Sequence, residues 1–324
     1  MKKEELEVSV IPLTRLQYFP IMMFAIVMGM SGFTLIYQKS NFGIPVIVSE
    51  ILMFVTVLLF ISISFIYLLK TVRYLDEVIK EFHHPVRNNF FAAISVSFLL
   101  VSMTLVGKFN NIAQYLFYIG AVLHIILTFS TLKMWAKNSF HKKHLNPAWF
   151  IPIVGNVLVP VAGIKFMEKN LLMFYFSIGI FFWLILTTIL INRIIFHDRL
   201  AEKFLPTFFI LIAPPALTMT AYVKLTGHYD FFASTLYNIT LFFTFLLFFM
   251  YKDFIKIKFF ISWWAFTFPL SAVTLSSILS YHKTHYIYYH YLSMLFFGVT
   301  TIVILLVSFQ TIKHIIKGEI CIDE

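Results

Sequence analysis

The stretch from Ile261 to Ser280 reads ISWWAFTFPLSAVTLSSILS, an uncharged segment long enough to cross a membrane as a helix and interrupted by one proline. At helical spacing, one stripe of this segment holds mostly small side chains: Ala265, Phe268, Ala272 and Ser276. Phe268 is the only bulky member of the stripe. Because Pro269 leaves the Ala265 carbonyl without its helical donor, we expect a bend at this point. The stripe predicts either close helix packing or a narrow pathway plugged by Phe268.

The whole chain has the composition of a polytopic membrane protein. Of its 324 residues, 60% are hydrophobic and 12% are charged, and the mean hydropathy is +0.86. The period-two alternation of a membrane barrel is absent. The N-terminal sequence MKKEELEVSV is too polar for a cleaved signal peptide, and the single cysteine, Cys321, excludes an internal disulfide. We therefore expect one transmembrane domain over residues 1–324, with a short N-terminal segment (1–14), a short tail (313–324) and no soluble domain for nucleic acid.

Ten apolar segments are predicted to be membrane helices, and the basic residues set their orientation. The segments lie at 15–37, 44–69, 88–107, 111–132, 147–167, 170–192, 206–223, 229–251, 259–280 and 286–312. Of the 25 Lys and Arg residues, 19 lie at the termini and in the connections on the same side, and 6 lie on the opposite side. By the positive-inside rule, both termini of this multi-pass protein are predicted to be cytoplasmic, in the inner (plasma) membrane.

The ten segments form an internal repeat of five helical hairpins. Prolines fall within the odd-numbered segments or at their starts, whereas the even-numbered segments have only Pro45, at an entrance. Small and polar residues also gather in the odd segments, and the eighth segment is bulky nearly all round. We therefore predict an all-α fold in which five bent inner helices form a central pore surrounded by five straight outer helices.

Ionisable side chains are scarce inside these segments. The odd segments have none away from their ends, and the even segments offer Glu50, near the outer face, and His124, near mid-depth. A neutral histidine bonded to a neighbouring helix is the more common role for His124, and a proton relay is the alternative. A cation filter would need rings of Asp or Glu, which the odd segments lack.

Other chemical motifs are weak. His141 and His144, and likewise His282 and His285, form pairs without a third metal ligand, so we expect no metal site. Phosphate-binding glycine loops and nucleophile motifs are absent. The sequence therefore gives no reason to expect an enzyme or a cofactor.

Five quoted motifs resemble one known family. They are FPIMMFAIVMGMSG (19–32), FHHPVRNNFFAA (82–93), NPAWFIPIVGNVLVP (146–160), FILIAPPALTMTAY (209–222) and WWAFTFPLSA (263–272), one at each odd segment. Together they are similar to the tellurite-resistance TehA and slow-type anion channel family. The resemblance implies a homotrimer in which each subunit has its own pore, closed by a phenylalanine on the ninth helix.

The resemblance also implies site residues. The gate falls at Phe268, with Phe266 as the alternative, and Gly155 and Asn156 match positions near the pore. We assign four further residues to the pore lining: Phe24, Ala265, Ser271 and Ala272. Arg15 and Arg87, at inner helix starts, would raise the anion concentration at the cytoplasmic mouth.

The sequence is compatible with three functions. The leading one is a passive channel for small monovalent anions such as nitrate and chloride, favoured because a charge-free pathway suits easily dehydrated anions. The second is a proton-coupled or exchanging transporter of dicarboxylates or oxyanions, such as malate, sulfite or tellurite, that uses Glu50 or His124. A membrane scaffold or sensor is the third, and the short loops and tails disfavour it.

Overall fold

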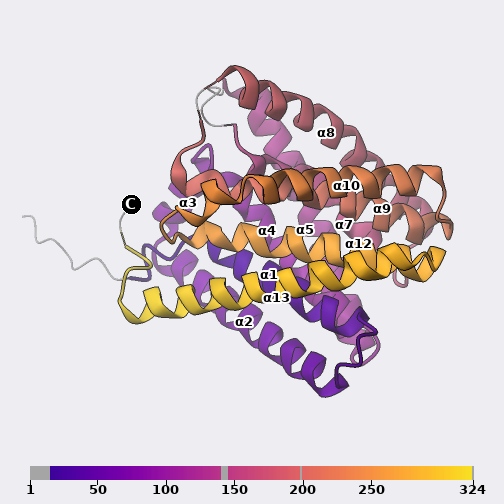
Figure 1. The fold of residues 1–324 in the computed structure, drawn as a ribbon. Helices are drawn as coiled ribbons and strands as arrows, with labels where there is room; N and C mark the ends of the chain where they lie inside the picture. Colours follow the sequence, from indigo (N-terminus) through magenta and orange to yellow (C-terminus); the bar gives the residue numbers. More distant parts are fainter. Residues whose placement is uncertain (1–14, 140–144, 198, 323–324) are drawn as a thin grey trace, which may run out of the picture.

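The structure is a computed structural model that describes residues 15–139, 145–197 and 199–322, and all its regular secondary structure is helical (Figure 1). In these ranges, nine helical segments are long and apolar enough to cross a membrane: Ile21–Lys39, Val46–Arg73, Arg87–Leu105, Asn110–Lys137, Lys169–Phe196, Glu202–Thr226, Phe231–Phe249, Ile261–Thr284 and Ile287–Ile316. Pro147–Gly163 is a shorter apolar run. The chain is therefore a multi-pass membrane protein, as its composition predicted.

Five of these segments, which we call the compound segments, change helical type along their length. They are η1 (Ile21–Met23) with α1 (Phe24–Lys39); η2 (Arg87–Phe91) with α4 (Ala92–Leu105); η4 (Pro147–Trp149), α6 (Phe150–Val154), η5 (Gly155–Val157) and α7 (Leu158–Gly163); η6 (Glu202–Ile212) with α9 (Ala213–Thr226); and η7 (Ile261–Phe266) with α12 (Thr267–Thr284). Each begins with a 3₁₀ turn. The five other segments of membrane length, which we call the straight helices, are α2 (Val46–Arg73), α5 (Asn110–Lys137), α8 (Lys169–Phe196), α10 (Phe231–Phe249) and α13 (Ile287–Ile316).

Prolines account for several of these changes of helical type. Pro206 lies inside η6. Pro214 lies in the first turn of α9, where a backbone N–H would have no hydrogen-bond partner within the helix, so its absence costs no hydrogen bond. Pro269 is likewise in the first turn of α12, directly after the 3₁₀ turn η7. The bend that we expected inside a continuous α-helix is therefore a junction between a 3₁₀ turn and an α-helix.

Burial separates the two kinds of segment. In the four compound segments that reach full membrane length, 72 to 78% of the most apolar window is buried, against 28 to 33% in the straight helices. The straight helices present large apolar side chains outward, such as Phe65 on α2 and Phe245 on α10. Apolar side chains that face outward are stable only in contact with lipid or another subunit, so the straight helices form the membrane-facing layer.

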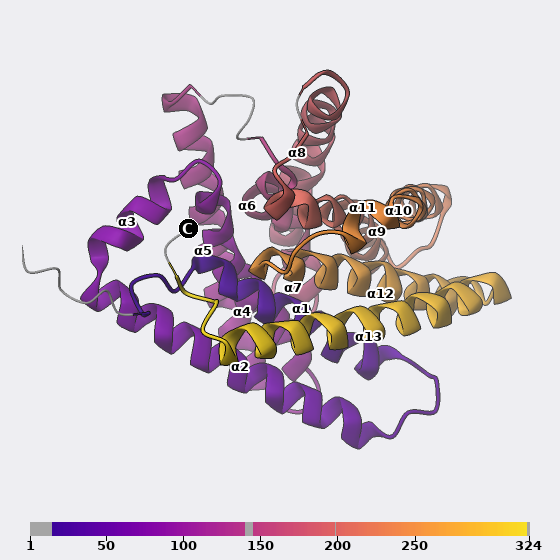
Figure 2. The ribbon, with the colours of Figure 1, turned by 60° about the vertical axis from the view of Figure 1, so that its left-hand side comes forward.

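The compound segments contact one another in a cyclic order. α1 contacts α4 and α12, α9 contacts α7 and α12, and α4 contacts α7. Each compound segment also packs against the straight helix that follows it, as α12 does against α13 in Figure 2. Both described ends of the chain lie at one end of the bundle, which we call the terminal face (left in Figure 1). The opposite end, the hairpin face, holds the short connections 40–45, 106–109, 164–168, 227–230 and 285–286.

Two connections contain short helices that the sequence did not predict, α3 (Leu75–His83) and α11 (Tyr251–Ile255), and α3 is the longer of the two. α3 is amphipathic and extends from the end of α2 at the terminal face (Figure 2). Its Glu81 is buried and accepts hydrogen bonds from Lys70 Nζ at 2.9 Å, Tyr67 Oη at 3.0 Å and the Ile21 backbone N–H at 2.8 Å. Lys70 also donates to the Phe19 carbonyl. This ion pair joins α3, α2 and the start of the first compound segment, and we call it the Glu81 clamp.

Candidate functional site

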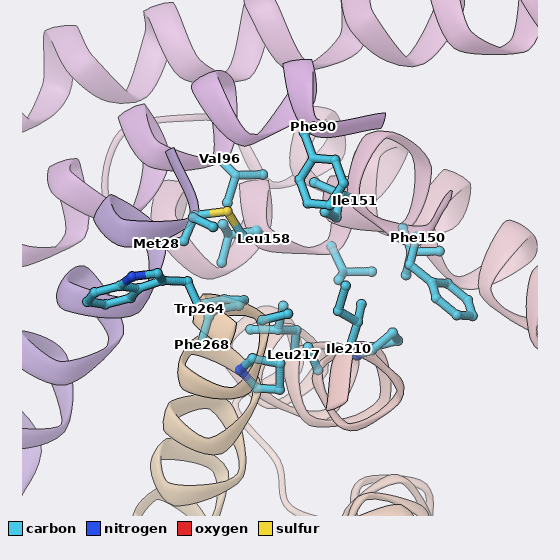
Figure 3. A pocket seen from close by; sticks show the side chains of 18 residues that line it. Met28, Phe90, Val96, Phe150, Ile151, Leu158, Ile210, Leu217, Trp264 and Phe268 are labelled. Atoms are coloured by element: carbon cyan, nitrogen blue, oxygen red, sulfur yellow. The ribbon is translucent and has the colours of Figure 1, made fainter. Parts of the chain in front are cut away.

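Two cavities lie along the axis of the compound segments. The terminal-side cavity, of about 70 Å³, is lined by uncharged residues from all five compound segments, several of which converge in Figure 3. The hairpin-side cavity, of about 160 Å³, is lined by residues of α1, α4, α7, α9 and α12. The straight helices contribute nothing to either lining. Among the residues that the structure describes, both cavities are thus lined by the compound segments alone.

Three residues line both cavities and separate them. They are Leu158 of α7, Leu217 of α9 and Phe268 of α12. Phe268 has the largest side chain of the three, and 8% of it is exposed. Its ring edge also lies close to Gly32 of α1, where an added Cβ would be 3.5 Å from Phe268 Cδ2. Phe268 is therefore packed across the space between the two cavities.

Three further residues that we assigned to the pore line a cavity. Gly155 and Ala265 line the terminal-side cavity, and Ala272 lines the hairpin-side cavity. Along α12 the lining continues through Leu275 and Leu279. The stripe of the ninth segment therefore faces the cavities as far as Ala272. Beyond Ala272, larger side chains of α12 form the lining.

The other assigned residues contact neighbouring elements. Phe24 packs edge-to-face on Tyr67 of α2, with ring centroids 6.0 Å apart. Ser271 donates to the Thr267 carbonyl and is packed against Gly32 of α1, so its hydroxyl lies within a helix contact. Phe266, the alternative gate, joins an aromatic cluster in which its ring centroid is 4.7 Å from that of Phe209.

Asn156 and His124 belong to a buried polar network between η5 and α5. Asn156 Nδ2 donates to Thr128 Oγ1 at 2.8 Å, and His124 Nδ1 lies 2.8 Å from Ser95 Oγ. The imidazole lies against Gly155, where an added Cβ would be 2.8 Å from His124 Cε1. Gly155 thus makes room for His124 directly behind the wall of the terminal-side cavity.

Glu50 lies far from this network. It forms an ion pair with Lys108 across the hairpin face, with 2.6 Å between Oε1 and Nζ, and both side chains are partly exposed.

A larger cavity of about 900 Å³, which we call the vestibule, opens at the terminal face. Arg87 lines it, as do residues of the C-terminal segment that include Cys321, and burial raises the pKa of the Cys321 thiol to about 11. Arg15 lies beside Gly318 at the same face. The vestibule carries both signs of charge: Lys70, Arg87, Lys203 and Lys258 against Glu77, Glu81 and Glu319.

Lys224, which the sequence reasoning counted only for topology, is part of the hairpin-side lining. It lies in the last turn of α9, and its Nζ donates to the Val161 carbonyl at 2.8 Å. Lys39 and His282 line the same cavity. The available signal was its position: Lys224 directly follows the odd segment predicted at 206–223 and precedes Gly227, a residue type that commonly ends a helix.

Metal-ligating residues do not cluster in the part of the chain that the structure describes: no group of three His, Cys, Asp or Glu side chains there could hold an ion. His282 lines the hairpin-side cavity, and His285 ends α12 with a left-handed backbone. The other pair, His141 and His144, lies outside the described residues.

The sequence of residues 18–312 matches the family described as voltage-dependent anion channel. The chain belongs to this family, a class that the multi-pass helical fold and the axial cavities also fit. It is 26% identical over 306 residues to the S-type anion channel SLAH2 of Arabidopsis thaliana, covering 91% of this chain and 59% of SLAH2. With SLAH3 of the same plant, the identity is 27% over 270 residues, 80% of this chain and 42% of SLAH3.

A bacterial relative matches over nearly its whole length. The tellurite resistance protein TehA homolog of Haemophilus influenzae is 26% identical over 303 residues, 91% of this chain and 90% of that protein. By contrast, the chain spans about half the length of the two plant relatives. The family resemblance drawn from the five motifs is therefore confirmed.

Proposed function

We propose that this protein is a passive channel for small monovalent anions, with a pathway through the five compound segments that Phe268 closes. The observation that carries the proposal is the shared lining: in the described part of the chain, compound segments alone line both axial cavities, and Phe268 lines both of them. A ring of this size leaves no room for a partly hydrated anion, so the gate opens only if Phe268 moves.

The arrangement we propose around this pathway has ten membrane helices as five hairpins, with Pro147–Gly163 as the fifth inner helix. The cyclic contacts among the compound segments support it. We place the terminal face in the cytoplasm, because 19 of the 25 Lys and Arg residues lie on that side of the chain. The outward apolar faces of the straight helices would contact lipid and, as the family resemblance implies, two further copies in a homotrimer in the plasma membrane.

Selectivity in this proposal comes from the cost of dehydration. The terminal-side cavity has an uncharged lining, so an ion that passes it sheds water without a fixed counter-charge. Larger monovalent anions lose water more easily, and we expect nitrate and iodide to pass more readily than chloride, with negligible permeation of sodium or potassium.

The test is a reversal-potential measurement on purified protein in bilayers, using a gate variant such as Phe268→Ala so that current is measurable. Under opposed potassium and nitrate gradients, the proposal predicts a reversal potential that follows nitrate. A potential that follows potassium would contradict it.

The runner-up is a proton-coupled or exchanging transporter of dicarboxylates or oxyanions. The two groups that the sequence suggested for proton coupling line neither cavity: Glu50 is paired with Lys108 at the hairpin face, and His124 lies behind Gly155. Strict coupling of anion flux to proton movement in liposomes would favour the transporter, whereas flux driven by the anion gradient alone favours the channel.

A further inference from the structure

The hairpin-side cavity carries positive charge that the terminal-side cavity lacks. Lys224 of α9, Lys39 at the end of α1 and His282 of α12 all line it. Within the described residues, no Asp or Glu contributes to this lining. The two cavities adjoin at Phe268, so the positive charge lies on only one side of that residue.

Lys224 has few partners of its own. Its side chain is half-buried, and among the described residues the one hydrogen bond from Nζ goes to the Val161 carbonyl. An ammonium group has three N–H donors, so donors remain for the contents of the cavity. Lys39 and Lys165 are close enough to act electrostatically on Lys224, and their charge repels it. A partly buried cation among other cations is normally balanced by an anion.

We infer that the hairpin-side cavity is a binding site for one small inorganic anion, such as chloride, bromide or nitrate, held by Lys224 Nζ beside Phe268. The cavity volume of about 160 Å³ accommodates such an ion with a few waters, since a water molecule takes about 30 Å³ of liquid. The inference rests on the proposed function, because this site would concentrate anions on one side of the proposed gate.

A purely structural role for Lys224 makes a different forecast. The Val161 carbonyl lies in the last turn of α7, where helical carbonyls have no partner and a lysine is a favourable cap. In that role, removing the ammonium would lower the stability of the protein without changing any dependence on anions. A binding experiment therefore separates the two roles.

The experiment measures the thermal unfolding midpoint of the purified full-length protein at rising bromide concentration, with gluconate keeping the ionic strength constant. The wild type should show a saturable increase. In Lys224→Gln, the half-saturating bromide concentration should rise by about tenfold, since a charge-assisted hydrogen bond is lost, and Lys224→Arg should retain most of the effect.

The matched control is Lys283→Gln. Lys283 is also a lysine at the hairpin end of a compound segment and donates to a backbone carbonyl, that of Gly227, but it is not part of the cavity lining. Its loss should leave the bromide dependence unchanged. If Lys224→Gln fails to fold, Lys224→Met provides the neutral variant with the closest shape.

Two outcomes overturn the inference: no saturable bromide effect in the wild type, or an unchanged half-saturating concentration in the neutral variant. Because binding is read without ion flow, a Phe268→Ala variant that does not conduct would count against the channel while leaving this site standing. Conversely, if anion flux is normal but bromide does not change the stability, the proposed channel function is supported and the proposed anion site is rejected.

Discussion

Gly155 illustrates how one missing side chain shapes the wall of the terminal-side cavity. Its Cα position allows the His124 imidazole to fill the space that a Cβ would occupy, and the imidazole in turn bonds Ser95 of α4. Gly155 thus lines the cavity on one side and has a buried polar network on the other. Gly155 is therefore needed first for the packing of His124, and its place in the cavity lining is a consequence of this packing.

Gly155→Ala should destabilise the protein by about 1–3 kcal/mol, since the new methyl group forces His124 out of its position. Thermal unfolding in detergent measures this. The control is Gly298→Ala on α13, where nothing lies within 4 Å of the added Cβ. There the better helix propensity of alanine should leave the midpoint unchanged or slightly raised. Equal midpoints for the two variants would show that the His124 contact is not tight.

Lys224 and Asn156 show what single-sequence reasoning could not provide. Which way a side chain on a buried helix points depends on the rotation of that helix against its neighbours, and this rotation follows from the packing of the whole bundle. Asn156 was therefore assigned to the pore although its amide donates to Thr128 of α5. Lys224 was taken for a loop charge because α9 extends three residues beyond the predicted end at 223.

The helix α3 and the Glu81 clamp hold the terminal face together. Glu81 is 5% exposed and Lys70 is 3% exposed, so both charged groups lose most of their contact with water once the helix has docked. Glu81 also satisfies the Ile21 N–H at the start of the first compound segment. The orientation of α3 is therefore tied to the first inner helix.

Glu81→Gln should detach α3, because it leaves the Lys70 ammonium buried without its counter-charge, a change that costs about 3–5 kcal/mol at buried pairs. Hydrogen exchange of the backbone of residues 75–83, followed by mass spectrometry, should become faster. Glu77→Gln is the control on the same helix, where Glu77 pairs with Lys80 at the exposed surface and little should change. Slow exchange in both variants would argue against the clamp.

For the helices, the sequence predicted which segments are buried better than it predicted the helical type within each segment. Prolines and small residues identified the odd segments as the buried ones, and those segments are the more buried in the structure. The 3₁₀ turns at their starts were not anticipated, because a proline is compatible with a kink, a helix start or a change of helical type, and the neighbouring helices decide which one forms. α3 was not predicted because it is an amphipathic helix of nine residues, and a run of apolar residues does not mark such a helix.

For the molecule as a whole, the proposed arrangement distinguishes an aqueous axis from a membrane-facing surface. Ala272, which is 2% exposed, lines the hairpin-side cavity, whereas Phe245 is 46% exposed on α10. Cysteines at these two positions would therefore occupy opposite environments once the gate is open.

In a Phe268→Ala, Cys321→Ser background, Ala272→Cys should react with a small charged thiol reagent added to the water, and Phe245→Cys should not. Cys321 is replaced because it is the only native cysteine. Its thiol, with a pKa raised to about 11, reacts slowly at neutral pH but would still add a background. Labelling is counted by mass spectrometry of the intact protein. Equal protection of both positions would contradict an aqueous path along the compound segments.

The most direct measurement of the central claim is the anion conductance of Phe268→Ala, beside Phe266→Ala and the wild type, in planar bilayers. Phe266 is the control because it is equally buried at 8% exposure but packs against Phe209 and Phe254, away from the lining of both cavities. If Phe268 closes the pathway, its replacement should raise the anion conductance at least tenfold over a nearly silent wild type, with anion selectivity kept, and Phe266→Ala should stay silent.

If Phe268 is only a packed core residue, its loss should cost about 3–5 kcal/mol of stability and leave the conductance unchanged. A folded Phe268→Ala protein with wild-type conductance would contradict the account, and a gain seen only in Phe266→Ala would move the gate to that residue.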